Sequence, residues 1–289
     1  MSRPRLPLFC LGLFVLKSLQ VFCIIYDLEM FEGSFDDQYI GCTEKMESIA
    51  PGLLRKERMK TRDLNVSWNI ASDLWKKEKH LLGRLPDGFK DEYGIALIVF
   101  SVQNFSVSKL LDRDIQIYSK NPKTFRFHSL HFYITRAFNL LQPGCDGKPL
   151  YTQRSFPELL FKPPSDPQAP VRLGLYINTL TNIGLEENRS ITLSFITCFG
   201  AKLLNFSYLL RNDIVIVPGN EVFQVTDYNE EKRNTTLQST HKKCSYYNCA
   251  YLGGTKNQNC TYYPPSSSSS SESRPAVRYL PPLGVYHTK

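Results

Sequence analysis

The spacing of apolar residues changes near residue 150, and this change constrains the fold more than any other feature of the chain. Before it, apolar residues recur at helical spacing over Trp68–Leu82 and Phe127–Leu141, which predicts two amphipathic helices. After it, short apolar segments bounded by Gly, Pro or Asn predict strands. We expect these strands at 172–179, 191–198, 213–217, 222–228 and 245–252. Helices followed by strands indicate an α+β fold, with an N-terminal helical lobe packed on a C-terminal antiparallel β lobe.

Two features of the helical half have more than one interpretation. Gly94–Phe100 is a continuous apolar run, which fits either a buried strand or a turn of a core helix. His131 lies on the apolar face of the second predicted helix. We prefer a core histidine bonded to the backbone, and a ligand or catalytic role is the alternative.

The first 23 residues have the pattern of a signal peptide. Arg3 and Arg5 precede an apolar run over Leu6–Leu16, and Lys17 interrupts this run well before the about 20 residues that a spanning helix needs. A signal anchor is the alternative. Removing residues 1–23 deletes three bases and no acids, so the formal net charge falls from +8 to +5. The remaining basicity is spread along the chain, so we expect no nucleic-acid partner.

The C-terminal segment 261–289 has the composition of a disordered tail. Two prolines precede six serines, Ser266–Ser271, and such a sequence cannot bury enough apolar area to fold. We therefore predict a folded domain at 27–260, with its helical lobe at about 27–145 and its β lobe at 150–260. No terminal apolar run of about 10 to 20 residues follows, as a lipid-anchor signal requires. The expectation is a secreted or extracellular chain without a membrane span or lipid anchor.

Cysteines and glycosylation sequons also favour an oxidising compartment. Six cysteines remain outside the predicted signal peptide, an even number that predicts three disulfides and no metal. A zinc site at Cys244, Cys249 and His241 is the alternative, although no second ligand pair follows them. Six Asn-x-Ser/Thr sequons predict surface glycans. They are Asn65, Asn104, Asn188, Asn205, Asn234 and Asn259.

Several segments resemble the vertebrate ecto-ADP-ribosyltransferases that use NAD to modify arginine, and they occur in the family's order. They are Gly33–Cys42, Gly94–Leu97, Leu130–Ala137, Thr197–Gly200 and Glu221–Val225. A further segment, Cys244–Cys260, is most similar to the third member of that family. The resemblance implies the ADP-ribosyltransferase fold, with NAD or NADP bound as a substrate between the two lobes.

The resemblance also implies how the cysteines pair. The family's bridges correspond to Cys42–Cys249 and Cys145–Cys198, which leaves Cys244 and Cys260 for each other. Closing a loop as long as that between Cys42 and Cys249 stabilises a fold by about 4 to 5 kcal/mol in the chain-entropy model.

Active members of the family use an arginine, a serine and a Glu-x-Glu pair on strands that face the cleft. The bond between nicotinamide and ribose breaks through an oxocarbenium-like state, which a carboxylate beside the ribose stabilises. The arginine holds the NAD phosphates. The first glutamate of the pair positions and activates the acceptor guanidinium.

The arginine and the serine are both replaced in this chain. The arginine position corresponds to Thr152, and Arg154 is the alternative if the register shifts by two residues. The serine position corresponds to Asn178, whose amide can both donate and accept hydrogen bonds. Gly174 and Tyr176, from the Gly-x-aromatic pattern before it, are candidate dinucleotide contacts. Phe100 is a third candidate as the wall of a pocket, with core packing as its alternative.

The Glu-x-Glu pair is replaced by Arg211-Asn212-Asp213. Asp213 keeps the charge of the second glutamate but is one methylene shorter, and a misplacement of about 1 Å can cost roughly a hundredfold in rate. Arg211 puts a cation where a guanidinium should bind. The alternative is a surface ion pair between the two side chains, without functional consequence.

The family resemblance implies transfer of ADP-ribose from NAD to a protein arginine, and the altered positions favour two other hypotheses. One is a catalytically silent extracellular domain that binds a protein partner. The other is a weak NAD glycohydrolase, in which Asp213 supports ribose cleavage and water is the acceptor.

Overall fold

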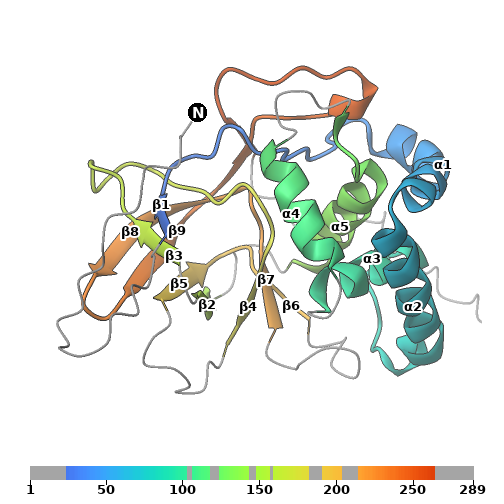
Figure 1. The fold of residues 1–289 in the computed structure, drawn as a ribbon, viewed down its shortest axis with the longest axis horizontal. Coiled ribbons are helices and arrows are strands. Elements are labelled where there is room, and N and C mark those ends of the chain that lie inside the picture. Colours follow the sequence, from blue (N-terminus) through green and yellow to red (C-terminus); the bar gives the residue numbers. More distant parts are fainter. Residues whose placement is uncertain are drawn as a thin grey trace, which may run out of the picture.

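The helices of the N-terminal half lie beside a curled sheet from the C-terminal half, which confirms the α+β prediction (Figure 1). This computed structural model describes residues 24–102, 106–117, 124–142, 148–156, 159–181, 191–203 and 214–263. The sites predicted at Asn104, Asn188, Asn205, Arg211 and Asp213, together with Cys145 and the segments 1–23 and 264–289, lie outside these ranges.

Five α-helices form the described part of the helical lobe. They are α1 (Thr43–Lys60), α2 (Arg62–Glu78), α3 (Asp91–Ser101), α4 (Val107–Ile117) and α5 (His128–Leu141), with the short 3-10 helix η1 (Lys79–Leu81) after α2. On α2, the side chains of Leu64, Trp68, Ala71 and Trp75 are buried and recur on one face of the helix. Both predicted amphipathic helices are therefore confirmed as α2 and α5.

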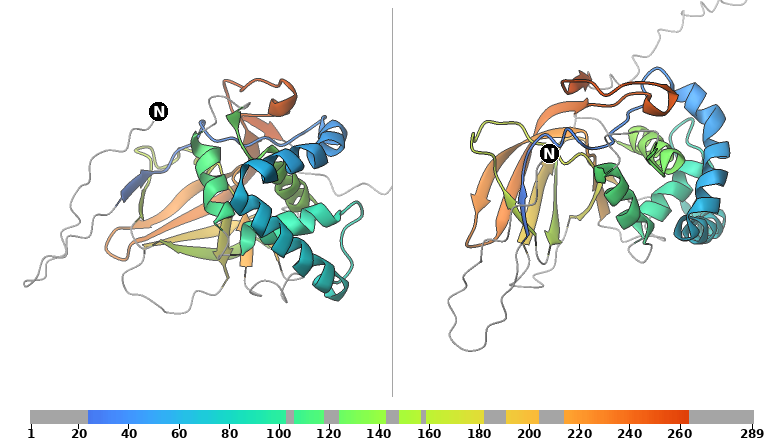
Figure 2. Two further views of the ribbon diagram at one scale, coloured as in Figure 1. Left: turned by 45° about the vertical axis from the view of Figure 1, so that its right-hand side comes forward. Right: turned by 45° about the horizontal axis from the view of Figure 1, so that its top comes forward.

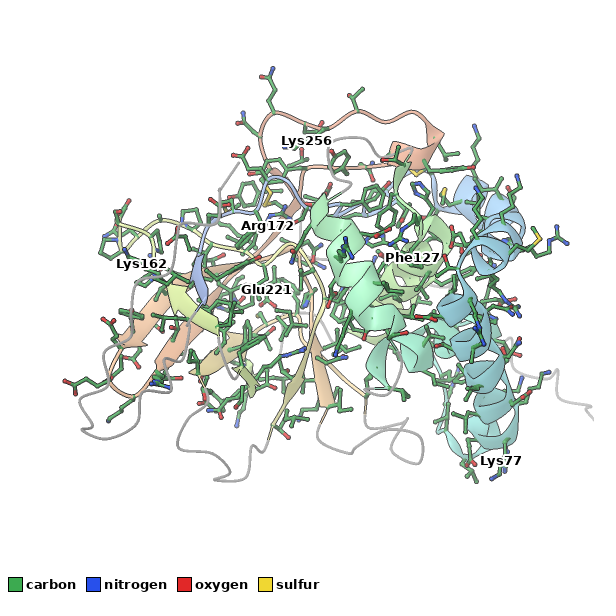
Figure 3. All side chains as sticks on the ribbon, in the orientation of Figure 1. Lys77, Phe127, Lys162, Arg172, Glu221 and Lys256 are labelled. Carbon is green, nitrogen blue, oxygen red and sulfur yellow. A yellow bond between two sulfur atoms is a disulfide. The ribbon has the colours of Figure 1, made fainter. Side chains whose placement is uncertain are left out.

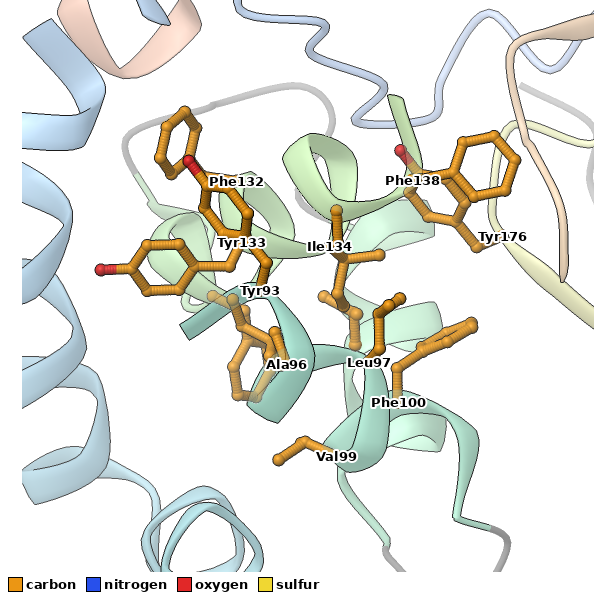
Figure 4. Close-up of a cluster of buried hydrophobic side chains, with 14 of the residues drawn as sticks. Tyr93, Ala96, Leu97, Val99, Phe100, Phe132, Tyr133, Ile134, Phe138 and Tyr176 are labelled. Atoms are coloured by element: carbon orange, nitrogen blue, oxygen red, sulfur yellow. The ribbon is translucent and has the colours of Figure 1, made fainter. Parts of the chain in front are cut away.

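Helix α3 lies at the centre of the lobe and has no exposed face. All nine residues from Tyr93 to Ser101 are buried, so the apolar run belongs to a core helix and not to a strand. A Cβ atom at Gly94 would lie 2.2 Å from the Trp75 ring, so glycine permits α2 and α3 to approach closely. Aromatic side chains of α3 and α5 form the neighbouring core, as Figure 4 shows.

His131 is a core residue, but its partner is a side chain and not the backbone. The Tyr39 hydroxyl lies 2.8 Å from Nδ1 of His131, and the Phe35 ring packs edge-on against the imidazole. Burial, with a smaller contribution from His128, lowers the pKa of His131 to about 3. The imidazole is therefore neutral at physiological pH, and its role is structural.

The strands form an eight-stranded mixed sheet and a separate two-stranded pair. Their bounds are β1 (Ile24–Asp27), β2 (Leu150–Phe156), β3 (Leu159–Lys162), β4 (Ile177–Leu180), β5 (Ile191–Thr197), β6 (Ala201–Lys202), β7 (Ile214–Val217), β8 (Glu221–Asn229), β9 (Asn234–Ser245) and β10 (Thr261–Tyr263). The large sheet has the order β10-β9-β5-β2-β4-β7-β6, and β8 also pairs with β9. Two pairings, β5 with β9 and β1 with β3, are parallel, so the lobe is not purely antiparallel. Long connections separate the partners in both cases, as parallel pairing requires.

Three of the predicted segments differ from the structure by more than one residue. The strand expected at 172–179 shortens to β4, because Gly174 has a φ of 71° and breaks the extended chain. The strand expected at 245–252 is wrong: the chain leaves β9 at Ser245 and forms a 3-10 helix, η5, over Ala250–Leu252. The predicted tail at 261–289 starts too early, because Thr261–Tyr263 pair with β9 as β10.

Two adjacent aspartates explain why the chain leaves the sheet after Ser245. The carboxylate of Asp36 accepts hydrogen bonds from the amides of Tyr246 and Tyr247, and that of Asp37 accepts from Cys249 and Ala250. These amides would otherwise bond along a strand. Figure 2 shows the resulting course of the C-terminal segment over the top of the helices, next to the N-terminal segment.

Disulfides hold the same junction. Cys42 bonds to Cys249 and Cys244 bonds to Cys260, with Cα–Cα distances of 6.1 and 5.4 Å, as the resemblance implied. Both sulfurs of the alternative zinc site are therefore in disulfides, which makes that alternative wrong. Cys198 is also disulfide-bonded, and its expected partner lies outside the described residues.

A buried carboxylate joins α1 to the start of α5. Glu57 accepts hydrogen bonds from the backbone amide of Ser129, at 2.9 Å, and from its hydroxyl, at 2.5 Å. An acidic group at a helix N-terminus satisfies free amides and complements the helix dipole. Burial nevertheless raises the pKa of Glu57 to about 7, although the hydrogen bonds from Ser129 oppose this effect.

This raised pKa predicts a pH-dependent stability. The folded state holds the Glu57 proton more tightly than the unfolded state, so the free energy of unfolding should fall as pH rises from about 4.5 to about 7. A Glu57→Gln variant should lose about 2 to 3 kcal/mol less between pH 5 and pH 8 than the unmodified chain. Urea unfolding of both proteins at the two pH values measures this difference. Equal losses in the two proteins would contradict the assignment.

Candidate active-site cleft

A cavity of about 480 Å³ lies between the two lobes. Helices α3 and α4 contribute one wall, which includes Phe100, Ser101 and Asp112, and strands β2 and β4 contribute the other, which includes Arg154 and Asn178. Ile214, with which β7 begins, also lines the cavity. A cleft of this volume between two lobes is a usual place for a small-molecule site.

Thr152, at the position of the family arginine, does not line this cavity. Its side chain is fully buried, and its hydroxyl donates to the hydroxyl of Thr179 at 2.6 Å. That hydroxyl in turn donates to the carbonyl of Val215 at 2.8 Å. The two threonines therefore link β2, β4 and β7 inside the sheet, and Thr152 presents no cation to a phosphate.

Arg154, two residues further along β2, does line the cavity. Its guanidinium donates to the carbonyl of Asn178 at 3.1 Å and lies 5.2 Å from the centre of the Phe156 ring. Within the described part of the chain, no carboxylate lies within 4.0 Å of this guanidinium. Burial lowers the pKa of Arg154, and Asp112 partly offsets this effect. Of the two candidates for the arginine position, the structure brings Arg154 to the cleft.

Asn178, predicted at the serine position, lines the cleft. Its side-chain amide donates to the carbonyl of Phe100 at 3.4 Å, while its Oδ1 atom is buried and has no hydrogen-bond partner among the described residues. Ser101 Oγ and Asp112 Oδ1, on the opposite wall, are likewise buried without a partner in the described ranges. Buried polar atoms are normally satisfied by protein, water or ligand. The cleft therefore offers several unused hydrogen-bonding atoms to water or a ligand.

The aromatic candidates separate into two groups. Phe100 and Tyr176 both line the cleft, with ring centres 6.2 Å apart in an edge-on arrangement. The Tyr176 hydroxyl donates to Thr135 of α5 at 3.0 Å, so this ring also ties the sheet to the helical lobe. Gly174 lies elsewhere: a Cβ atom there would come within 2.0 Å of the Ser34 hydroxyl, so its role is to let the N-terminal segment pass.

Asp112 also lines the cleft, although it was not predicted as a site residue. It lies on α4, near the buried Leu111 and Ile115, so an acidic residue beside an apolar stripe was the available signal. Burial raises the pKa of Asp112 to about 7, and Arg154 opposes this increase. Near neutral pH, the cleft therefore holds a carboxyl group that is partly protonated.

This arrangement predicts how Asp112 titrates. Replacing Arg154 by Gln removes the cation that favours the ionised carboxyl, so the pKa of Asp112 should rise above its value in the unmodified chain. A carbon-13 NMR titration of the Asp112 carboxyl measures the change, with the exposed Asp166 as an internal reference. An unchanged or lower midpoint would show that the two groups do not interact.

Comparison with known proteins supports the resemblance seen in the sequence. A sequence model of the family described as NAD:arginine ADP-ribosyltransferase matches residues 28–245. The rat ecto-ADP-ribosyltransferase 5 is 32% identical over 264 residues, which cover 87% of this chain and 84% of the relative. The human ecto-ADP-ribosyltransferase 3 is also 32% identical, over 81% of this chain and 61% of the relative. The two relatives have the same percentage identity to this chain, so identity does not show that the chain is most similar to ecto-ADP-ribosyltransferase 3.

The fold has a solved counterpart as well. The crystal structure of a mutant of the eukaryotic mono-ADP-ribosyltransferase ART2.2, in complex with NAD, superposes with a TM-score of 0.67 and 29% identity. The match covers 78% of this chain and 99% of that protein. The family match over most of the chain and the shared fold lead to one conclusion. The chain belongs to the NAD:arginine ADP-ribosyltransferase family.

Proposed function

We propose that this chain is an extracellular member of the family that binds a partner or a dinucleotide but does not transfer ADP-ribose to arginine efficiently. The observation that carries the proposal is the burial of Thr152 at the position of the family arginine. A dinucleotide diphosphate needs a charged donor, and a guanidinium binds phosphate oxygens with two parallel hydrogen bonds. A buried threonine hydroxyl that already donates to Thr179 supplies neither charge nor a free donor.

Arg154 can supply a cation to the cleft, but at a different place. A shift of two residues along a strand moves a side chain by about 6 to 7 Å. One donor of Arg154 is already used by the Asn178 carbonyl. An anion held by Arg154 is therefore displaced from the position where the family's chemistry occurs, and about 1 Å of misplacement can already cost roughly a hundredfold in rate.

The residues predicted at the other catalytic positions also disfavour transfer to arginine. Asn178 replaces the serine, Asp213 replaces the second glutamate with a shorter side chain, and Arg211 replaces the first. The resemblance puts Arg211 at the position of the first glutamate, where an arginine acceptor would meet a like charge instead of a carboxylate. Loss of the acceptor site and of the phosphate site together favours binding over transfer.

An extracellular location fits the same proposal. Two disulfides are present among the described residues, and disulfides persist in oxidising compartments. The relatives are named as ecto-enzymes. None of the helices in the described ranges is both long enough and apolar enough to cross a membrane. The partner is then an extracellular protein, which need not offer an arginine.

The test is transfer of labelled ADP-ribose from NAD to an arginine-rich acceptor, with ART2.2 as the active reference. We expect the secreted chain to be slower than the reference by at least about a hundredfold. A repaired variant that combines Thr152→Arg, Asn178→Ser, Arg211→Glu and Asp213→Glu should gain measurable transfer. Because Thr152 is buried, thermal unfolding must first show that this variant is folded.

Two outcomes would contradict the proposal. One is rapid transfer by the unmodified chain that disappears in an Asp213→Ala control. The other is a well-folded repaired variant without activity, which would mean that the cleft itself, and not only its catalytic positions, has diverged.

A further inference from the structure

Five basic residues gather on one exposed surface where α1 ends and α2 begins. They are Arg55, Lys56, Arg58, Lys60 and Arg62, and four of them are exposed, whereas Arg58 is half-buried. We call this surface the α1–α2 basic surface. Figure 1 shows α1 and α2 at the edge of the molecule that faces away from the sheet. The surface is therefore separate from the cleft between the lobes.

The expectation that the basicity is spread along the chain is wrong in this region. The sequence 55–62 looks interrupted by Glu57, but that side chain is buried and bonded to Ser129 of α5. Asp63, the next acidic residue, accepts a hydrogen bond from the Ser106 hydroxyl at 2.6 Å. Within the described part of the chain, no carboxylate lies within 4.0 Å of any of the five cations. Their charge is therefore available to a ligand.

The surface is hollowed, and most of the residues that line the hollow are basic. The hollow has a volume of about 950 Å³ and is open to solvent. Besides the cations, it is lined by Gly52, Met59 and Asn65. Gly52 leaves open space on the α1 side, because a Cβ atom there would meet no atom within 4 Å. Arg58 is held in place by hydrogen bonds to the side chains of Asn65 and Asn69, at 3.0 and 2.5 Å.

We propose that the α1–α2 basic surface binds a sulphated polysaccharide. A linear polyanion with fixed charges matches a run of exposed cations, and short Lys/Arg-rich segments are a known feature of heparin-binding surfaces. Met59 is the only apolar side chain in the lining, whereas a protein interface needs an apolar core and is depleted of lysine. The lining has no aromatic ring on which a nucleic-acid base could stack.

A lipid surface fits less well. Anionic lipids that attract basic segments are concentrated in the cytoplasmic leaflet, whereas relatives of this chain are named as ecto-enzymes. Exposed apolar residues near the surface are few: Met59 is 80% exposed, and Val66 on α2 is 47% exposed.

The experiment measures binding of heparin to the full chain secreted from animal cells. Ion pairing with about five sulphates predicts an affinity that falls roughly 100-fold between about 50 and 200 mM salt. A triple variant, Arg55→Gln with Lys56→Gln and Lys60→Gln, should bind more weakly, and its affinity should fall only about 10-fold over the same salt range. The matched control is Lys76→Gln with Lys77→Gln and Lys232→Gln, which removes the same charge from exposed positions elsewhere. This control should bind as the unmodified chain does.

Several results would overturn the proposal. They are the absence of heparin binding by the unmodified chain, equal weakening in the two triple variants, and equal binding of desulphated heparin. Binding to phosphatidylserine vesicles but not to heparin would replace the polysaccharide by a membrane. All substituted side chains are exposed, so urea unfolding should give the same midpoint for each variant and confirms that the fold is intact.

Discussion

A fully buried ion pair between Asp36 and Arg172 determines where the two ends of the domain lie. The two side chains are almost completely excluded from solvent, and the guanidinium lies 2.5 Å from the carboxylate. Arg172 also donates to the carbonyls of Met30 and Cys244, at 2.7 and 3.1 Å, so it contacts both the N-terminal segment and the end of β9. Figure 3 places it at the centre of the molecule, below the N-terminal segment. A buried charge that loses its partner typically costs about 3 to 5 kcal/mol, so neither residue is readily replaced alone.

The residues at and around the ion pair hold the fold together, and they are different from the residues predicted for catalysis. The ion pair holds the N-terminal segment against Gly174, and the chain runs from there through Tyr176 into β4, which carries Asn178 to the cleft. Asp37 and the Cys42–Cys249 disulfide hold the start of α1 at the same junction. None of these groups is among the residues predicted for catalysis. The fold of the cleft is shared with ART2.2, whereas the arginine and serine positions are predicted to be replaced.

The sequence predicted best the helices in which apolar residues recur at helical spacing. Helix α2 has an apolar face and a polar face, and the apolar residues of α5 recur at helical spacing, so both helices were recognised. Helix α3 is buried on all sides, so its residues show no period, and a strand and a helix could not be distinguished. The strand expected at 245–252 depended on a contact more than 200 residues away, since Asp36 and Asp37 take the amides that a strand would have used.

The cleft, too, could be predicted from the sequence only in part. The resemblance predicted where the arginine and the serine should lie, but the sequence could not decide between Thr152 and Arg154, because the choice depends on which side chain the sheet buries. Asp112 belongs to an ordinary amphipathic helix, and only the position of α4 across the cavity from β2 and β4 brings it to the cleft. The basic residues of α1 and α2 were visible in the sequence, but the burial of Glu57, which leaves them unopposed, was not.

The central claim is that the cleft keeps the fold of the family but no longer cleaves NAD. Every reaction of the family, whether the acceptor is arginine or water, breaks the bond between nicotinamide and ribose. Release of nicotinamide from NAD, followed by proton NMR in the presence of the secreted chain, therefore tests the claim most directly. The account predicts release at the rate of a protein-free blank. Faster release that disappears in an Asp213→Ala variant would contradict it.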